Sequence, residues 1–171
     1  MRRGILLTTL LATAACGRSH EGEEQVGSVG FKAIPGWQRA DTKDRRTTTA
    51  VFTPAANGRR ESITVIRTEL GPIAEHYTPE MLSTLLLKAQ STLPQAKVTP
   101  VAKLTTPEGL SGVRLELDYV PPGLSRSYHR VHVILAEESG RGLVHVLYTA
   151  AAPEPEEALL QQVVNTLHEE S

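Results

Sequence analysis

The sequence predicts an α+β domain in which an antiparallel sheet of six or seven strands is flanked by helices on both faces. Three observations lead to this fold. Runs rich in β-branched and aromatic residues alternate with turn signals, two segments have the spacing of amphipathic helices, and the last two predicted strands are apolar on both sides. Strands with two apolar faces need cover on both, and the two helices are the elements available to provide it.

The domain is expected to begin with a short strand and a hairpin. Pro35 and Gly36 end the first strand, and the charged stretch 39–46 is expected to be an exposed loop. Asn57 and Gly58 both tolerate positive φ and therefore predict a turn between the next two strands. The three strands are expected at Phe31–Ile34, Thr47–Phe52 and Ser62–Thr68.

A helix and four further strands follow, and a second helix closes the domain. Thr78 can cap the first helix, Pro79 suits its first position, and Pro94 ends it. The apolar side of this helix consists of Leu82, Leu85, Leu86, Ala89 and Leu93. The strands are expected at Val98–Leu104, Val113–Tyr119, Tyr128–Ala136 and Leu143–Ala150, and the last helix has its apolar stripe at Leu160, Val163, Val164 and Leu167.

Two pairs of carboxylates are expected to be solvated. Apolar and charged residues alternate along 113–119, which places Glu116 and Asp118 on a wet face of that strand. Glu137 and Glu138 are expected in a turn. General acid catalysis needs a carboxyl group in an apolar pocket, so neither pair is expected to be catalytic.

The first 15 residues have the three parts of a secretory signal. Arg2 and Arg3 form a basic start, an apolar run follows from Ile5 to Ala12, and small residues lead to Cys16. The apolar run is much shorter than the stretch of about 20 residues that crosses a bilayer. Cys16 is the one cysteine in the chain, so the exported domain has no internal disulfide.

The end of this leader resembles the lipobox of bacterial lipoproteins, because Ala14 and Ala15 directly precede Cys16. The resemblance implies a lipoprotein signal peptide over residues 1–15, with lipid on Cys16 as the membrane anchor. Thr13 stands where the lipobox usually has leucine. The alternative is ordinary signal peptidase cleavage, which would release a protein with a free thiol.

The residues after Cys16 indicate where the anchored domain is placed. Gly17 stands where aspartate would direct retention, and by resemblance to the sorting rule of Gram-negative lipoproteins this favours the outer membrane, facing the periplasm. Residues 16–29 are polar and rich in glycine and glutamate, so they are expected to form a flexible tether without core residues. One α/β/α domain is then expected over 30–171.

The order of elements resembles the PsbP/Mog1/DcrB-like group of α/β/α proteins. The likeness rests on the stretch from Phe31 to Trp37, a strand followed by proline and tryptophan, and on the helix from Glu156 to Leu167. It spans about residues 30–168. The resemblance implies a noncatalytic accessory or binding subunit, as in many bacterial lipoproteins of this group, and it supplies no site residues.

Composition and motifs argue against several classes of function. A net charge of −1 and an aromatic content of 4% give no surface for nucleic acid. The stretch from Gly109 to Gly112 lacks the spacing of a nucleophile elbow, and no glycine-rich loop stands between a predicted strand and a predicted helix. We therefore expect neither catalytic residues nor a cofactor.

His132 and His145 are the candidate metal ligands. If residues 137–140 form a four-residue turn, the two histidines lie directly opposite each other on neighbouring strands, with Cβ atoms about 5 Å apart. Zinc usually takes three or four protein ligands, so the favoured interpretation is a polar pair without metal. His129 is expected on the opposite face from His132.

Two further places are candidates for binding. Trp37 could anchor a partner, or it could lie buried at the end of a strand. Arg126, Tyr128 and Arg130 gather positive and aromatic groups beside the loop at 121–123, where an anionic ligand could bind. A charged strand end is the alternative interpretation of that stretch.

These features predict an envelope lipoprotein, anchored to a membrane by its N-terminal lipid, whose noncatalytic domain holds a protein partner. The competing prediction is a small-ligand or metal-binding protein, or an enzyme, that uses the His132/His145 face or the loop Arg126–Arg130. A deep pocket lined by ionisable groups with shifted pKa values would favour the second prediction, and a shallow apolar patch would favour the first.

Overall fold

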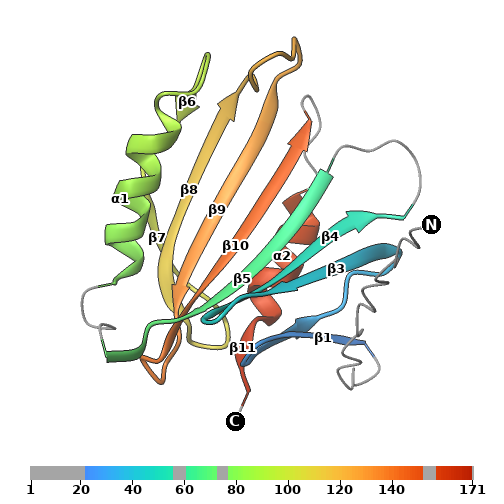
Figure 1. The fold of residues 1–171 in the computed structure, drawn as a ribbon, viewed down its shortest axis with the longest axis vertical. Coiled ribbons are helices and arrows are strands. Elements are labelled where there is room, and N and C mark those ends of the chain that lie inside the picture. The colour runs from blue at the N-terminus through green and yellow to red at the C-terminus, as the bar shows by residue number, and fades with distance from the viewer. Residues whose placement is uncertain (1–21, 56–60, 73–76, 152–156, 171) are drawn as a thin grey trace, which may run out of the picture.

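The computed structural model describes residues 22–55, 61–72, 77–151 and 157–170, and within them it confirms the α+β fold (Figure 1). An antiparallel sheet of eight strands forms the middle layer. β6 and β7 pair with successive parts of the outer edge of β8. In spatial order the sheet consists of β3 (Trp37–Lys43), β4 (Thr47–Pro54), β5 (Glu61–Glu69), β10 (Gly142–Ala151), β9 (Tyr128–Ala136), β8 (Ser111–Tyr119), then β6 (Lys97–Val98) and β7 (Ala102–Thr105).

The sheet has more strands than expected because two segments differ from their predictions. The charged stretch 39–46, expected to be a loop, contains most of β3, which pairs with β4 and forms an exposed edge of the sheet. Charged side chains are typical of edge strands, where they hinder pairing with other chains. The single strand expected at Val98–Leu104 is divided into β6 and β7, and Pro100 between them has no N–H to donate to a ladder.

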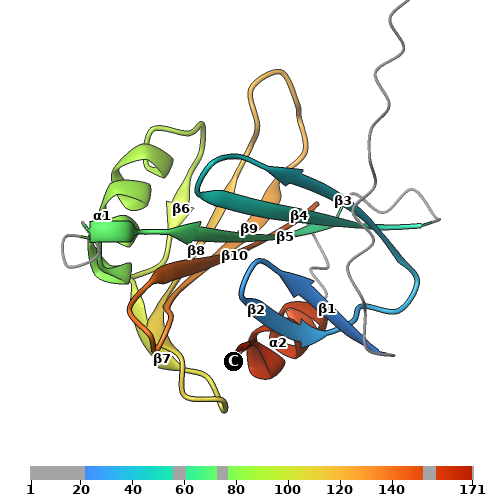
Figure 2. The ribbon, with the colours of Figure 1, turned by 60° about the horizontal axis from the view of Figure 1, so that its bottom comes forward.

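A second layer covers one face of the main sheet (Figure 2). It consists of helix α2 (Glu157–Thr166) and a small antiparallel sheet of β1 (Glu23–Val26), β2 (Val29–Lys32) and β11 (His168–Glu169). The predicted apolar stripe of α2 faces the core, since Leu160 and Val163 are fully buried. The main core of the molecule lies between these two layers, where Phe31 of β2 packs edge-on against Phe52 of β4.

The flexible tether expected at residues 16–29 is wrong for its second half. Gly27 and Ser28 form the turn that joins β1 to β2, and Gly27 has a φ of 64°, which glycine adopts without strain. Val26 and Val29 on either side of the turn are completely buried. Two valines in a polar stretch are too short a pattern to predict a strand. Residues 16–21 lie outside the described part of the chain.

The opposite face of the main sheet carries α1 (Pro79–Gln90), whose start agrees with the sequence. The Thr78 hydroxyl accepts a hydrogen bond from the backbone N–H of Met81 at 3.2 Å, and Pro79 occupies the first helical position. The helix lies over β8 and β9. Within the described residues, α1 and α2 are each too short to cross a bilayer.

A buried ion pair of the main sheet faces the second layer, at a place where the sequence predicts a solvated turn. The carboxylate of Glu137 is buried and accepts hydrogen bonds from Arg67 Nε at 2.8 Å and from Arg67 Nη2 at 3.2 Å. Ser28 Oγ donates to the same carboxylate at 2.8 Å. Glu137 thus precedes the turn and points into the interior, because a buried cation is present there to neutralise it.

Candidate functional site

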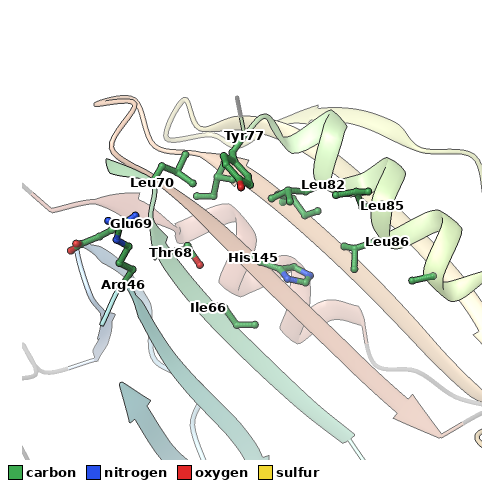
Figure 3. Close-up of a pocket in the computed structure, with 13 residues that line it drawn as sticks. Arg46, Ile66, Thr68, Glu69, Leu70, Tyr77, Leu82, Leu85, Leu86 and His145 are labelled. Carbon is green, nitrogen blue, oxygen red and sulfur yellow. The ribbon is translucent and has the colours of Figure 1, made fainter. Parts of the chain in front are cut away.

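A pocket of about 630 Å³ lies between α1 and the main sheet (Figure 3). It exists because α1 packs over β8 and β9 and leaves the same face of β5 and β10 open beside it. Thirteen residues line it: Arg46, Ile66, Thr68, Glu69, Leu70, Tyr77, Leu82, Leu85, Leu86, Ala89, Ile134, Leu143 and His145.

Apolar side chains make up both walls of this pocket. Leu82, Leu85 and Leu86 project from α1, and Ile66 projects from the sheet opposite them. Ile134 of β9 also lines the pocket. Leu85 is 57% exposed, although its spacing predicts burial on the core side of the helix. A large leucine is exposed here because the sheet below it is too far away to cover it, so the pocket presents unfilled apolar surface to the solvent.

The polar groups of the pocket come from three places. Arg46, Thr68 and Glu69 come from one end of it, where β4 begins and β5 ends. The carboxylate of Glu69 is already paired with Arg67 at 2.7 Å. Tyr77, which precedes α1, adds a hydroxyl group. His145 stands on the floor of the pocket between Ile66 and Ile134, its direct partners on the two neighbouring strands.

His145 and His132 form a hydrogen-bonded pair. His132 Nδ1 and His145 Nε2 lie 2.9 Å apart, and the rings are stacked with their centroids 5.1 Å apart. The residues are not directly opposite, as expected, because the turn comprises residues 138–141 instead of 137–140, which places His132 opposite Leu147. The two histidines still share a face of the sheet and meet as diagonal neighbours.

Burial keeps both imidazoles neutral. Loss of solvation lowers the pKa of His132 to about 3, with further lowering from nearby His145 and Arg130. Loss of solvation also lowers the pKa of His145 to about 4. Both rings are therefore uncharged at neutral pH, and each carries one N–H and one bare nitrogen.

Within the described part of the chain, the histidine pair is not among the groups of three residues that could hold a metal ion. Among the described residues, the group of three that could hold an ion is Glu116, His129 and Glu157, on the other face of the sheet. Its carboxylates are occupied, since Arg114 contacts Glu116 and Glu157 at 2.5 Å each. This cluster ties the start of α2 to β8 and β9, which is a structural role.

Within the stretch from Arg126 to Arg130, one arginine faces the solvent and the other packs against neighbouring side chains. Arg126 is exposed in the loop before β9. Arg130 lies with its guanidinium 4.5 Å from the ring centroid of Tyr119 and donates to the Tyr119 hydroxyl and, at 3.3 Å, to Gln90 of α1. Tyr128 packs beside Tyr119, with ring centroids 6.2 Å apart. The arginines thus do not converge on a common site.

The remaining candidates from the sequence lie away from the pocket. Trp37 is half-buried at the start of β3, where it packs against the main core. His129 hydrogen-bonds Asp118 and Glu157 on the face opposite to His132. Cys16 lies outside the described residues. Sequence reasoning missed the pocket. The signal that could have indicated it is the apolar side of α1, since Leu82, Leu85, Leu86 and Ala89 all line the pocket. Leu93, expected on the same side of the helix, lies beyond its end at Gln90.

No family model and no curated protein matches the chain. Two solved structures are similar to it over most of their length. One is LpqN of Mycobacterium tuberculosis, described as involved in cell envelope biogenesis, which is 15% identical with a TM-score of 0.54 over 84% of this chain and 83% of LpqN. The other is the Ran-binding protein Mog1p of Saccharomyces cerevisiae, which is 14% identical with a TM-score of 0.53 over 84% of this chain and 90% of Mog1p. These likenesses concern the fold, and the chain has the PsbP/Mog1-like fold that its sequence resembles.

Proposed function

We propose that this chain is a lipid-anchored envelope protein whose domain binds a small, largely apolar ligand in the pocket between α1 and the main sheet. The observation that carries the proposal is the pocket itself, with apolar side chains on both walls and few polar groups. Small-molecule sites in proteins have this composition, and their volumes are roughly 300–1,000 Å³. The volume of about 630 Å³ falls within that range.

The size of the pocket favours a small ligand over a folded partner as its occupant. A stable interface between proteins uses about 20–30 residues on each side. Thirteen residues line this pocket. Leu85 and Tyr77, both more than a third exposed, would become covered when a ligand enters, and burial of apolar surface is the main source of affinity in such a site.

The chemistry of the pocket favours binding without catalysis. A general acid or base works best when its pKa lies near the operating pH. His145, the imidazole that lines the pocket, has a pKa of about 4, and His132 behind it has a pKa of about 3. Neither is a good proton acceptor at neutral pH.

Two separate arguments support a place in the cell envelope. Cys16 follows a basic, apolar and small-residue leader, so lipid on its sulfur would hold the domain at a membrane, and Gly17 favours the outer membrane facing the periplasm. LpqN, which has a similar fold, is described as involved in cell envelope biogenesis. Mog1p has the same fold and is described as a Ran-binding protein, so the fold alone does not decide the location.

The test of binding uses two neighbouring leucines of α1. Leu86 lines the pocket, whereas Leu87 is 36% exposed and does not. Nile red, an uncharged apolar dye, should bind the wild-type chain, and Leu86→Trp should fill the pocket and weaken binding at least about 10-fold. Leu87→Trp, the matched control, should leave binding unchanged. Equal binding by all three proteins would contradict the proposal.

A second candidate function is to hold a protein partner, and the exposed leucines of α1 favour it. Leu85 and Leu87 are 57% and 36% exposed, two positions apart in the helix and therefore on different sides of it. Leu87 does not line the pocket, so a protein partner could bury it whether or not a ligand is bound. Leu87→Asp should then abolish crosslinking to a partner in native envelopes while it leaves Nile red binding intact.

A further inference from the structure

His145 places a hydrogen-bonding atom on an otherwise apolar floor. Its Nε2 is occupied by His132, at 2.9 Å. Its Nδ1 has no hydrogen-bond partner among the described residues, and it is not one of the fully buried polar atoms either. Because His145 lines the pocket, this nitrogen is open to whatever occupies the pocket.

His132 decides which nitrogen of His145 carries the proton. The Nε2 of His132 is buried and has no hydrogen-bond partner in the described ranges of the chain. A buried N–H without a partner is rarer and more costly than a buried lone pair without one, so the proton of His132 belongs on Nδ1. From there it is donated to His145 Nε2, which leaves His145 with its own proton on Nδ1. The pocket floor therefore offers an N–H donor.

The charges around the pocket leave no net charge for a ligand to neutralise. At one end of it, Arg46 and Arg67 carry two positive charges, and Glu69 and Glu137, both paired with Arg67, carry two negative ones. Both imidazoles are neutral, because burial lowers their pKa values to about 3 and about 4. A charged ligand group brought to His145 would lose its hydration without gaining a full countercharge, and that loss is costly.

We propose that the ligand is an uncharged amphiphile, an apolar body with an ester, amide or hydroxyl oxygen that accepts a hydrogen bond from His145 Nδ1. The inference rests on the proposed function and adds the class of ligand to it. His145 is the specificity-determining residue of the pocket, and His132 is a positioning residue, since it acts through the tautomer of His145. The apolar body lies between the leucines of α1 and the isoleucines of the sheet.

Three decyl probes test the inference on the full chain with Cys16→Ala, which removes the lipid into which the probes would partition. Methyl decanoate is uncharged and has acceptor oxygens, 1-chlorodecane has no oxygen, and decanoate is charged. Calorimetric titration at pH 7.5 should rank methyl decanoate tightest, about 3- to 10-fold above 1-chlorodecane, since one hydrogen bond is worth that factor. Decanoate should bind at least about 10-fold more weakly than methyl decanoate.

His145→Phe keeps the size and apolar character of the side chain but removes the donor. It should abolish the preference for methyl decanoate over 1-chlorodecane, and His168→Phe, a histidine outside the pocket, should preserve it. In the wild-type chain the ¹⁵N shift of His145 Nδ1 should change when methyl decanoate binds.

The outcomes separate this inference from the function on which it rests. Decanoate binding as tightly as methyl decanoate, or a preference that survives in His145→Phe, would overturn the uncharged amphiphile and leave the apolar pocket as a binding site. Failure of all three probes to bind would overturn both proposals.

Discussion

His132 Nδ1 and His145 Nε2 are joined by a 2.9 Å hydrogen bond, although the two residues are two positions out of register on neighbouring strands. The contact connects a buried ring to the floor of an open pocket. His132 is 3% exposed, while His145 lines the space beneath α1. A ligand that contacts His145 therefore also affects His132 through this hydrogen bond, since the His132 ring has no other side-chain partner among the described residues.

The histidine pair should make the fold sensitive to acid. The folded-state pKa values, about 3 and about 4, lie below the value of 6.5 expected in the unfolded chain. Between these values the unfolded chain binds protons that the folded chain does not, so the free energy of unfolding decreases as the pH falls from about 6.5 towards 4. Each group contributes up to about 1.4 kcal/mol per pH unit in that window.

Urea unfolding at pH 7.5 and pH 5 measures this effect. The double variant His132→Leu/His145→Phe should lose less stability between the two pH values than the wild type, because it lacks the two imidazoles that take up protons on unfolding. Identical losses in the two proteins would mean that the pair is not buried as described.

Truncation of Glu137 should destabilise the domain strongly. Arg67 donates two hydrogen bonds to this carboxylate and would be left with Glu69, which lies at the surface, as its anionic partner. Glu137→Ala should cost about 3–5 kcal/mol of unfolding free energy. Replacing both charges, in Arg67→Met/Glu137→Leu, should recover most of the loss, and a double variant as unstable as the single one would show that packing, not charge, dominates.

Leu117→Asp should prevent folding. Leu117 is 1% exposed on the face of β8 that lies beneath α1, as the alternation along the strand predicts. An unpaired carboxylate there would cost about 4 kcal/mol or more, a large part of the stability of a single domain. Lys103→Asp on the exposed strand β7 is the control. A cooperative thermal transition near the wild-type temperature in Leu117→Asp would refute the placement of Leu117 on the buried face of β8.

Cys16→Ala should release the protein from the membrane. The lipid on the Cys16 sulfur is the proposed anchor, and fractionation of cells followed by intact-mass analysis of the purified protein would detect it. The variant should move from the detergent-soluble fraction to the aqueous one. An unmodified thiol in the wild type, or a first residue other than Cys16, would indicate ordinary signal peptidase cleavage instead.

Elements with strong local signals agree with the sequence. Thr78 and Pro79 mark the start of α1, and β9 covers Tyr128–Ala136 as expected, because its apolar run is long and bounded by turns. The sequence does not predict the short strand β1 or the charged strand β3. Their formation depends on pairing with segments that are adjacent only in the folded chain, which periodicity within the strand does not report.

The pocket was harder to predict for a different reason. Most of its residues come from α1, β5, β9 and β10, and its volume depends on how far α1 is displaced towards β8. The histidine pair was predicted as a pair, but its register depended on Glu137, whose burial beside Arg67 moves the turn by one residue. Which residue pairs with a buried charge depends on the tertiary structure, so the pattern within one strand does not predict it.

Mapping of backbone amide shifts during titration with methyl decanoate tests the central claim most directly. If the ligand binds between α1 and the sheet, the largest changes should fall on the lining residues, led by Ile66, Leu86 and His145. Changes centred on Arg126–Arg130, or no saturable changes at all, would contradict the assignment of this pocket as the binding site.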